Sequence, residues 1–240
     1  SSEVLVPSWR QDLKCEADIA EEVARFYGYD MIPATLPKAT MTMGGLSRFR
    51  LVSDAARSII EKYGYSESKT FSFESPNVYD RLRIPGGDTR RDAIEISNPL
   101  GVDYSIMRTT PLNGMLTSLG TNYKHKNKDV RLYELAKIYI PKSLPLTELP
   151  DERMTLTLGM YGDGDFFDMK GCIEELMHLG IKDFMRFEAN PKKHPYLHPG
   201  RCADIYIGDE LCGYMGQVHP GVAADYGIKR DAYVGVLDLK

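Results

Sequence analysis

The stretch VRLYELAKIYI, residues 130–140, is the clearest indication of how this chain folds. Its residues alternate in the way that is typical of a β-strand. Further strands are predicted from the patterns of residues 154–161, 202–207, 211–218 and 234–239. The turn GDE, residues 208–210, joins two of these strands as a hairpin. Locally paired strands with helices between them predict an α+β fold, with a largely antiparallel sheet flanked by helices.

Helices are predicted where apolar residues recur three and four positions apart. This spacing marks residues 16–27, 47–63, 111–123 and 167–179. Glycines follow three of these segments, at Gly28, Gly64 and Gly180, and Pro111 begins the remaining one. Shorter extended segments are predicted at residues 67–73, 93–97 and 183–188.

Residues 30–45, DMIPATLPKATMTMGG, contain two prolines and a glycine pair and show no periodicity. They are typical of an extended connector. We therefore expect a domain boundary near Pro37, with a small N-terminal module remnant and its connector in residues 1–37 and a larger domain in residues 38–240. The first residues lack an initiator methionine and run straight into a strand-like pattern, which suggests an excised piece of a longer protein.

The composition excludes several classes of protein. Hydrophobic residues make up 42% of the 240 residues, and no apolar run approaches the ~20 residues that a membrane-spanning helix needs. The formal net charge of -4 does not favour nucleic-acid binding, and the short basic stretch at residues 122–131 is more simply a solvated loop. The four cysteines show no CxxC spacing, which favours reduced thiols in the cytoplasm. Glycine-rich nucleotide motifs and the GxSxG element are absent from the sequence.

An acidic segment precedes the connector, in the stretch PSWRQDLKCEADIAEEVARFYGYDMIP at residues 7–33. In a helix, Asp18, Glu21 and Glu22 share one side, and Asp12 can reach them from the preceding loop. Such oxygen ligands suit Mg²⁺. Alternatively, Asp18 charges the helix start while the glutamates are solvated, or Arg10 pairs with the acids and holds them without metal. The spacing leaves these alternatives open.

His194, His198 and Cys202 follow one another at intervals of four and could suggest a zinc site. Prolines between them interrupt any helix that would align their side chains. A structural turn leading into the strand expected at Cys202 is the simpler interpretation.

Several longer motifs occur together in this chain. They are residues 7–33, NPL (98–100), MRT (107–109), RLYELAKIY (131–139), DFFDMKGCIEELM (165–177), HPGR (198–201) and GYMGQVHP (213–220). In type, order and separation they resemble the beta subunit family of bacterial phenylalanyl-tRNA synthetases. The resemblance implies that residues 1–37 end a B5 module and that residues 38–240 resemble a class II synthetase core without catalytic activity.

The residues after RLYELAKIY support the expected loss of chemistry. In active class II enzymes this strand is followed at once by an arginine and, two residues on, a glutamate, which hold ATP and the end of the tRNA. Here those positions are Ile140 and Lys142. A glycine-rich turn with an arginine, the third class II signature, does not appear near the C-terminal residues GVLDLK. The alternatives are an independently active ATP-dependent ligase on the same fold, and a tRNA-binding module, which the acidic balance disfavours.

The resemblance also implies cofactors and partners. The family binds Mg²⁺ through acids at the positions of Asp12, Asp18, Glu21 and Glu22, in a site shared with the alpha subunit. Weak or absent Mg²⁺ binding is therefore expected in the isolated chain. The implied assembly is a cytoplasmic heterotetramer of two alpha and two beta subunits, in which the alpha subunit attaches phenylalanine to tRNA(Phe) using ATP. No membrane association is expected.

Overall fold

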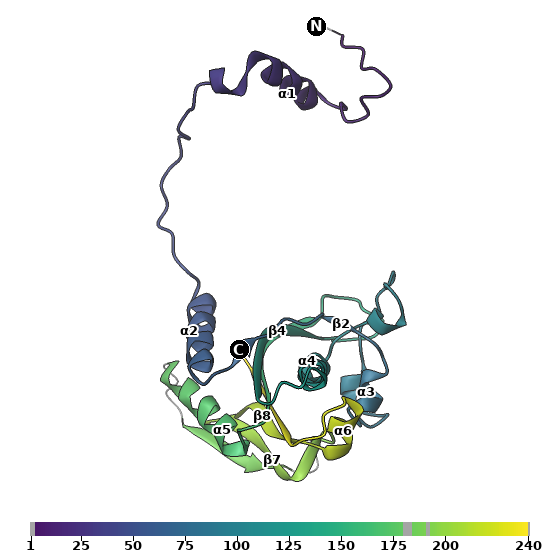
Figure 1. The fold of residues 1–240 in the computed structure, drawn as a ribbon, viewed down its shortest axis with the longest axis vertical. Helices are drawn as coiled ribbons and strands as arrows, with labels where there is room; N and C mark the ends of the chain where they lie inside the picture. The colour runs from purple at the N-terminus through teal and green to yellow at the C-terminus, as the bar shows by residue number, and fades with distance from the viewer. Residues whose placement is uncertain (1–2, 180–183, 191–192, 240) are drawn as a thin grey trace. The chain divides into compact units, whose positions relative to one another are not determined.

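The computed structural model describes residues 3–179, 184–190 and 193–239. The chain divides into two compact units, Ser1–Gly45 and Leu46–Lys240 (Figure 1). The boundary expected near Pro37 falls inside the first of these units. Within the described ranges, no helix is both long and apolar enough to cross a membrane.

The first unit contains helix α1 (Glu16–Tyr27), which confirms the prediction for residues 16–27, and a short 3-10 helix (Tyr29–Met31). Asp18 supports the start of α1, because its carboxylate accepts hydrogen bonds from the backbone N–H groups of Lys14 and Cys15. Gly28 ends the helix with a φ of 95°, a conformation that favours glycine. No side chain of α1 is buried.

The second unit is built on a seven-stranded sheet in the residues that the structure describes. The strand order is β1-β4-β5-β9-β8-β7-β6, and every neighbouring pair is antiparallel apart from β1 and β4. The predicted α+β fold with a largely antiparallel sheet is therefore confirmed. The strands are β1 (Ser66–Glu67), β4 (Val130–Ile140), β5 (Asp151–Tyr161), β6 (Met185–Ala189), β7 (Leu197–Ile207), β8 (Glu210–Val218) and β9 (Ala232–Asp238), and a separate pair is β2 (Phe73–Glu74) with β3 (Ile106–Met107).

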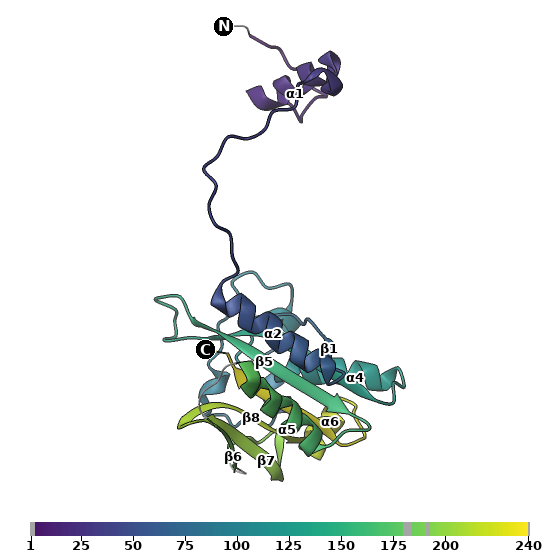
Figure 2. The ribbon, with the colours of Figure 1, turned by 90° about the vertical axis from the view of Figure 1, so that its left-hand side faces the viewer.

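Helices cover both faces of this sheet. The α-helices are α2 (Arg48–Lys62), α3 (Val78–Arg81), α4 (Leu112–Lys124), α5 (Phe166–Glu175) and α6 (Pro220–Asp225), and 3-10 helices cover Thr89–Arg91, Val102–Tyr104 and Leu176–Leu179. Figures 1 and 2 show α4 against one face and α2 with α5 against the other. The alternation of β5 explains both cores: Leu156, Leu158 and Met160 pack with α2 and α5, whereas Tyr161 packs with α4.

Three short segments differ from the sequence predictions. Residues 67–73 do not form one strand, because the backbone N–H of Thr70 donates to the buried carboxylate of Glu134 instead of joining a ladder. Residues 93–97 make a single bridge, between Glu95 and Ile106. The strand expected from Cys202 begins at Leu197, since a register shift between Leu197 and Cys202 accommodates the intervening proline and glycine.

The remaining predictions agree with the structure to within a few residues. The helices expected at residues 47–63 and 111–123 are α2 and α4, and the strand expected at residues 130–140 is β4. Residues 167–179 form α5 followed by the 3-10 helix Leu176–Leu179. Gly180, the glycine expected after the helix of residues 167–179, and Asp183, the first residue of the extended segment expected at 183–188, lie outside the described residues.

Candidate functional site

The acidic segment of the first unit is organised by Arg10. Its Nε lies 3.0 Å from Asp12 Oδ1, and its Nη2 lies 2.7 Å from Asp12 Oδ2 and 2.6 Å from Glu22 Oε1. Arg25 pairs with the other oxygen of Glu22. These hydrogen bonds from Arg10 lower the pKa of both Asp12 and Glu22, and Arg25 contributes at Glu22. The two carboxylates are therefore already neutralised by guanidinium groups.

The other two acids are not part of this cluster. Asp18 accepts backbone hydrogen bonds from Lys14 at 2.7 Å and Cys15 at 2.9 Å, and these bonds lower its pKa. Glu21 is exposed. Asp18 thus stabilises the helix start, which is one of the roles considered from the sequence.

The arrangement of this segment does not fit a metal ion in the chain by itself. Across residues 3–179, 184–190 and 193–239, no group of three or more His, Cys, Asp or Glu side chains is placed to hold a metal ion. The place between Asp12 and Glu22 is taken by the Arg10 guanidinium. The pairing of Arg10 with the acids, an alternative raised by the sequence, is therefore what the structure contains.

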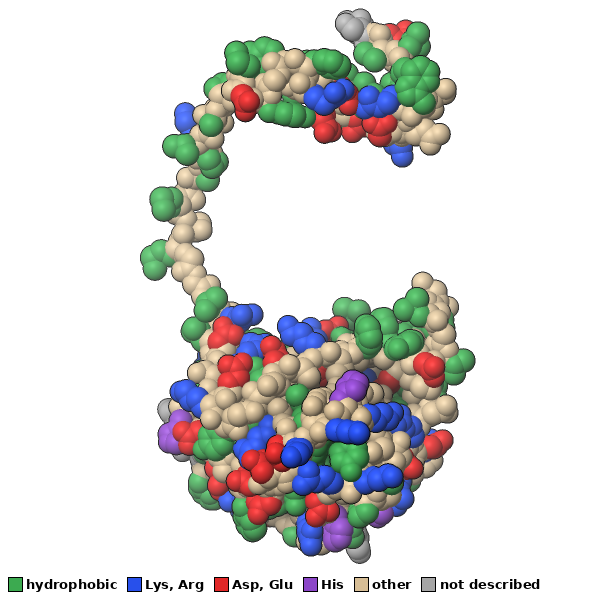
Figure 3. Space-filling view, viewed as in Figure 1, with side chains coloured by type: hydrophobic (Ala, Val, Ile, Leu, Met, Phe, Trp, Pro, Cys, Tyr) green, Lys and Arg blue, Asp and Glu red, His purple; other side chains and the backbone are tan. Residues whose placement is uncertain are grey.

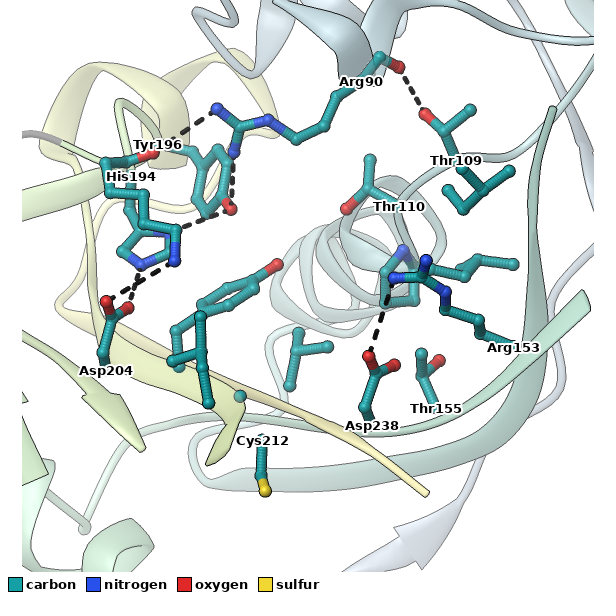
Figure 4. Close-up of a pocket in the computed structure, with 18 of the residues that line it drawn as sticks. Arg90, Thr109, Thr110, Arg153, Thr155, His194, Tyr196, Asp204, Cys212 and Asp238 are labelled. Atoms are coloured by element: carbon teal, nitrogen blue, oxygen red, sulfur yellow. Dashed lines mark hydrogen bonds and ion pairs between the residues drawn. The ribbon is translucent and has the colours of Figure 1, made fainter. Parts of the chain in front are cut away.

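The second unit contains a cavity of about 460 Å³ on the face of the sheet that also carries α4 (Figure 4). We call it the sheet-face pocket. Ile138 and Ile140 of β4, Thr155 of β5 and Val236 of β9 contribute to its floor. Ile140, the residue that directly follows RLYELAKIY, thus lines this pocket.

A buried polar network forms one wall of the sheet-face pocket. His194 Nε2 lies 2.6 Å from Asp204 Oδ1, and His194 Nδ1 lies 3.2 Å from the hydroxyl of Tyr196. Arg90 Nη1 donates to the same hydroxyl at 3.0 Å. Tyr214 stacks on the His194 ring with centroids 4.4 Å apart. Each polar group in this wall has a partner, so the wall is preorganised.

The charge states of this wall follow from its burial. Burial lowers the pKa of His194 and outweighs the hydrogen bond to Asp204. Burial alone would raise the pKa of Asp204. Hydrogen bonds from His194 and Asn190 outweigh this effect, so the pKa of Asp204 is lowered. A neutral imidazole whose Nε2–H donates to an ionised carboxylate satisfies both groups. His194 is therefore engaged with Asp204 and Tyr196, and the zinc arrangement with His198 and Cys202 is absent from the described residues.

The opposite side of the pocket carries Arg153 and Asp238 (Figure 4). Arg153 Nε donates to Asp151 at 2.5 Å, and its Nη1 lies 3.9 Å from Asp238 Oδ2. Thr155 uses its hydroxyl to donate to the carbonyl of Ala136 at 3.0 Å. Sequence reasoning missed these lining residues, because they come from segments far apart in the chain that share no spacing rule.

The chain matches models of two known protein domains. A model of the phenylalanyl tRNA synthetase beta chain CLM domain matches residues 32–239, and a model of the tRNA synthetase B5 domain matches residues 1–29. The chain belongs to the phenylalanyl-tRNA synthetase beta chain family.

Curated relatives in this family carry the name phenylalanine-tRNA ligase beta subunit. The protein of Clostridium acetobutylicum is 40% identical over 238 residues, which are 99% of this chain and 30% of the relative. Those of Geobacter metallireducens and Lactiplantibacillus plantarum are 35% and 33% identical, each over 98% of this chain and 30% of the relative. The chain therefore corresponds to a segment that spans about a third of the length of these beta subunits. The family resemblance drawn from the motifs is confirmed.

Proposed function

We propose that this chain is a non-catalytic, scaffold segment of a phenylalanyl-tRNA synthetase beta subunit. Its partner is the alpha subunit, which attaches phenylalanine to tRNA(Phe) with ATP in a cytoplasmic heterotetramer of two alpha and two beta subunits. The larger domain is a class II synthetase core that has lost its chemistry. Membership of the beta chain family supports this role.

One observation carries the loss of catalysis. The sheet-face pocket lies at the end of RLYELAKIY. The residue that directly follows this motif, the aliphatic Ile140, lines the pocket. Lys142, at the position of the second ATP-binding residue, pairs instead with Glu148 at 2.8 Å. An aliphatic side chain has no hydrogen-bond donor for a phosphate, so a nucleoside triphosphate lacks the arginine contact that would hold it here.

Exposed apolar side chains support the scaffold role. Phe71 and Tyr104 contact one another edge to face and are 75% and 40% exposed, and Leu100 and Val102 nearby in the chain are 90% and 73% exposed. Figure 3 shows hydrophobic side chains gathered on the surface of this unit. Apolar surface that monomeric proteins seldom leave in water is typical of an interface with another subunit.

The Mg²⁺ site is proposed for the complete complex alone. In the chain by itself Arg10 occupies the acidic segment, so a metal shared with the alpha subunit requires Arg10 to leave Asp12 and Glu22. In that complex Asp12, Asp18, Glu21 and Glu22 would hold Mg²⁺, which would offset part of their mutual repulsion. The test is co-purification with the alpha subunit, comparing the chain with its variant in which all four acids are alanine. Equal assembly of both would contradict the shared metal.

The scaffold proposal is tested by phenylalanine-dependent pyrophosphate exchange. We expect no exchange with the purified chain and robust exchange when it is co-expressed with the alpha subunit. Exchange by the chain alone would favour the independently active ligase. Salt-sensitive binding of tRNA by the chain alone would favour the tRNA-binding module instead.

A further inference from the structure

We propose that the sheet-face pocket binds a small organic molecule of zero net charge with an apolar body the size of one ring. Its lining contains no residue of the acidic segment and none of the exposed apolar residues that we assign to subunit assembly. Binding there does not depend on the chain's role in the ligase, because it requires only the residues that line the pocket.

The size of the cavity suits such a molecule. Its volume of about 460 Å³ lies within the usual range for ligand pockets, which is roughly 300 to 1,000 Å³. Ile138, Ile140, Leu211 and Val236 supply apolar lining. An apolar ring released from water onto these side chains gains the free energy of hydrophobic burial.

The side chains of the polar wall are buried and held in place by hydrogen bonds. Tyr196 and His194 are 2% and 3% exposed, and Asp204 is 1% exposed. Hydrogen bonds connect all three side chains, and Arg90 joins them through Tyr196. A pocket with a wall that is already ordered needs little rearrangement when a ligand enters, which lowers the entropic cost of binding.

The charges around the pocket decide the class of ligand. Each described cation in the lining already has a carboxylate partner: Arg90 lies 2.6 Å from Asp88, Arg153 lies 2.5 Å from Asp151, and Lys193 lies 3.6 Å from Asp204. Arg153 has a second carboxylate, Asp238, at 3.9 Å. The positive groups are therefore compensated before any ligand arrives. A phosphate or a lone carboxylate would meet at least as much negative charge as positive charge, whereas an uncharged or zwitterionic molecule meets no net repulsion.

Four probes that share a phenyl ring test this inference. They are phenylacetamide (uncharged), phenylglycine (zwitterionic), phenylacetate (anionic) and phenyl phosphate (anionic). Each is titrated into the ¹⁵N-labelled chain while amide chemical shifts are followed. We expect saturable shifts at Thr155, Gly213 and Val236 with phenylacetamide, phenylglycine or both, and binding at least tenfold weaker with the two anions. The titrations with phenylacetamide and phenylglycine show whether the pocket prefers an uncharged ligand or a zwitterion. Preference for either anion, or no binding by any probe, would overturn the proposal.

Two variants keep the test specific. Asp238→Asn removes one carboxylate beside Arg153, so we expect phenylacetate to bind several-fold more tightly than in the unmodified chain. Glu188→Gln removes a carboxylate that pairs with Arg186 on β6 and does not line the pocket, and it should change nothing. Ile140→Trp fills the cavity from a half-buried position and should abolish binding, with thermal unfolding as the check on folding. Unchanged binding by a folded Ile140→Trp variant would place the probe elsewhere and overturn the assignment.

Discussion

Arg108 and Glu134 form an ion pair in the interior of the second unit, with Arg108 Nη1 3.3 Å from Glu134 Oε2 and both side chains 2% exposed. Thr70 completes the group, since its backbone N–H donates to Glu134 at 2.7 Å and its hydroxyl accepts from Arg108 at 3.0 Å. Arg108 Nε also donates to the carbonyl of Lys137 at 2.8 Å. The motifs MRT and RLYELAKIY therefore meet in one buried network.

Breaking this pair should destabilise the chain strongly. Arg108→Met leaves the Glu134 carboxylate buried without its cation, and we expect a loss of about 3–5 kcal/mol in the free energy of unfolding, measured with urea. Replacing both residues, Arg108→Met with Glu134→Leu, should cost less than the two single changes together. Lys137→Met, which breaks an exposed pair with Glu152, is the control and should cost little. A strictly additive double variant would argue against the coupling.

Glu74 should make stability depend on pH. Burial raises its pKa to about 7; its Oε2 accepts from Asn113 at 3.2 Å, and its Oε1 has no hydrogen-bond partner among the described residues. The pKa is higher in the folded state than in the unfolded one, so the folded state binds the proton more tightly. The destabilisation by Glu74 is therefore complete above pH 7 and disappears as the pH falls toward the ordinary value of 4.5.

The matching variant is Glu74→Gln, which cannot ionise. Glu74→Gln should have a larger free energy of unfolding than the unmodified chain, and this advantage should be up to about 3 kcal/mol greater at pH 8 than at pH 5. Urea unfolding at both pH values gives this difference, and Glu188→Gln, at an exposed position, serves as the control. If the advantage of the glutamine were the same at both pH values, Glu74 would not titrate as described.

Gly120 should be intolerant of a side chain. A Cβ added there would lie 2.2 Å from the carbonyl oxygen of Tyr226, which is backbone and cannot turn away. Gly120→Ala should push α4 from the segment after α6 and cost about 1–3 kcal/mol. The control is Gly171→Ala in α5, where the added Cβ would meet no described atom within 4 Å beyond its own helix backbone and chain neighbours, and there alanine should stabilise by about 0.5–1 kcal/mol. Thermal unfolding of the two variants distinguishes a steric effect from a general effect of glycine replacement.

Arg10 should control metal binding by the isolated chain. Arg10→Gln removes the cation that holds Asp12 and Glu22, so the freed carboxylates should bind Mg²⁺ several-fold more tightly than in the unmodified chain. Amide chemical shifts near Asp12 and Glu22 during titration with magnesium chloride measure this. Arg50→Gln, which breaks a pair with Asp54 in the second unit, is the matched control. Identical titrations for the Arg10 variant and the unmodified chain would show that the guanidinium does not compete with the metal.

Local patterns in the sequence determined the elements themselves. Residues 16–27 and 130–140 form α1 and β4 with the predicted bounds, because helical spacing and strand alternation depend on near neighbours. The motifs of the chain also identified its family. The same local rules were wrong for residues 93–97, where one bridge to Ile106 replaces a strand, since pairing depends on a distant partner.

Only the tertiary structure decided how these elements combine and which partners their side chains take. The order β1-β4-β5-β9-β8-β7-β6 places β9 between β5 and β8, which no local pattern encodes. The sheet-face pocket exists because this order brings Ile140, Arg153 and Asp238 to one face. In the acidic segment the sequence showed both the carboxylates and Arg10. Whether the carboxylates pair with a metal ion or with Arg10 depends on the distances between them. The folded chain sets those distances, and it places the guanidinium between Asp12 and Glu22.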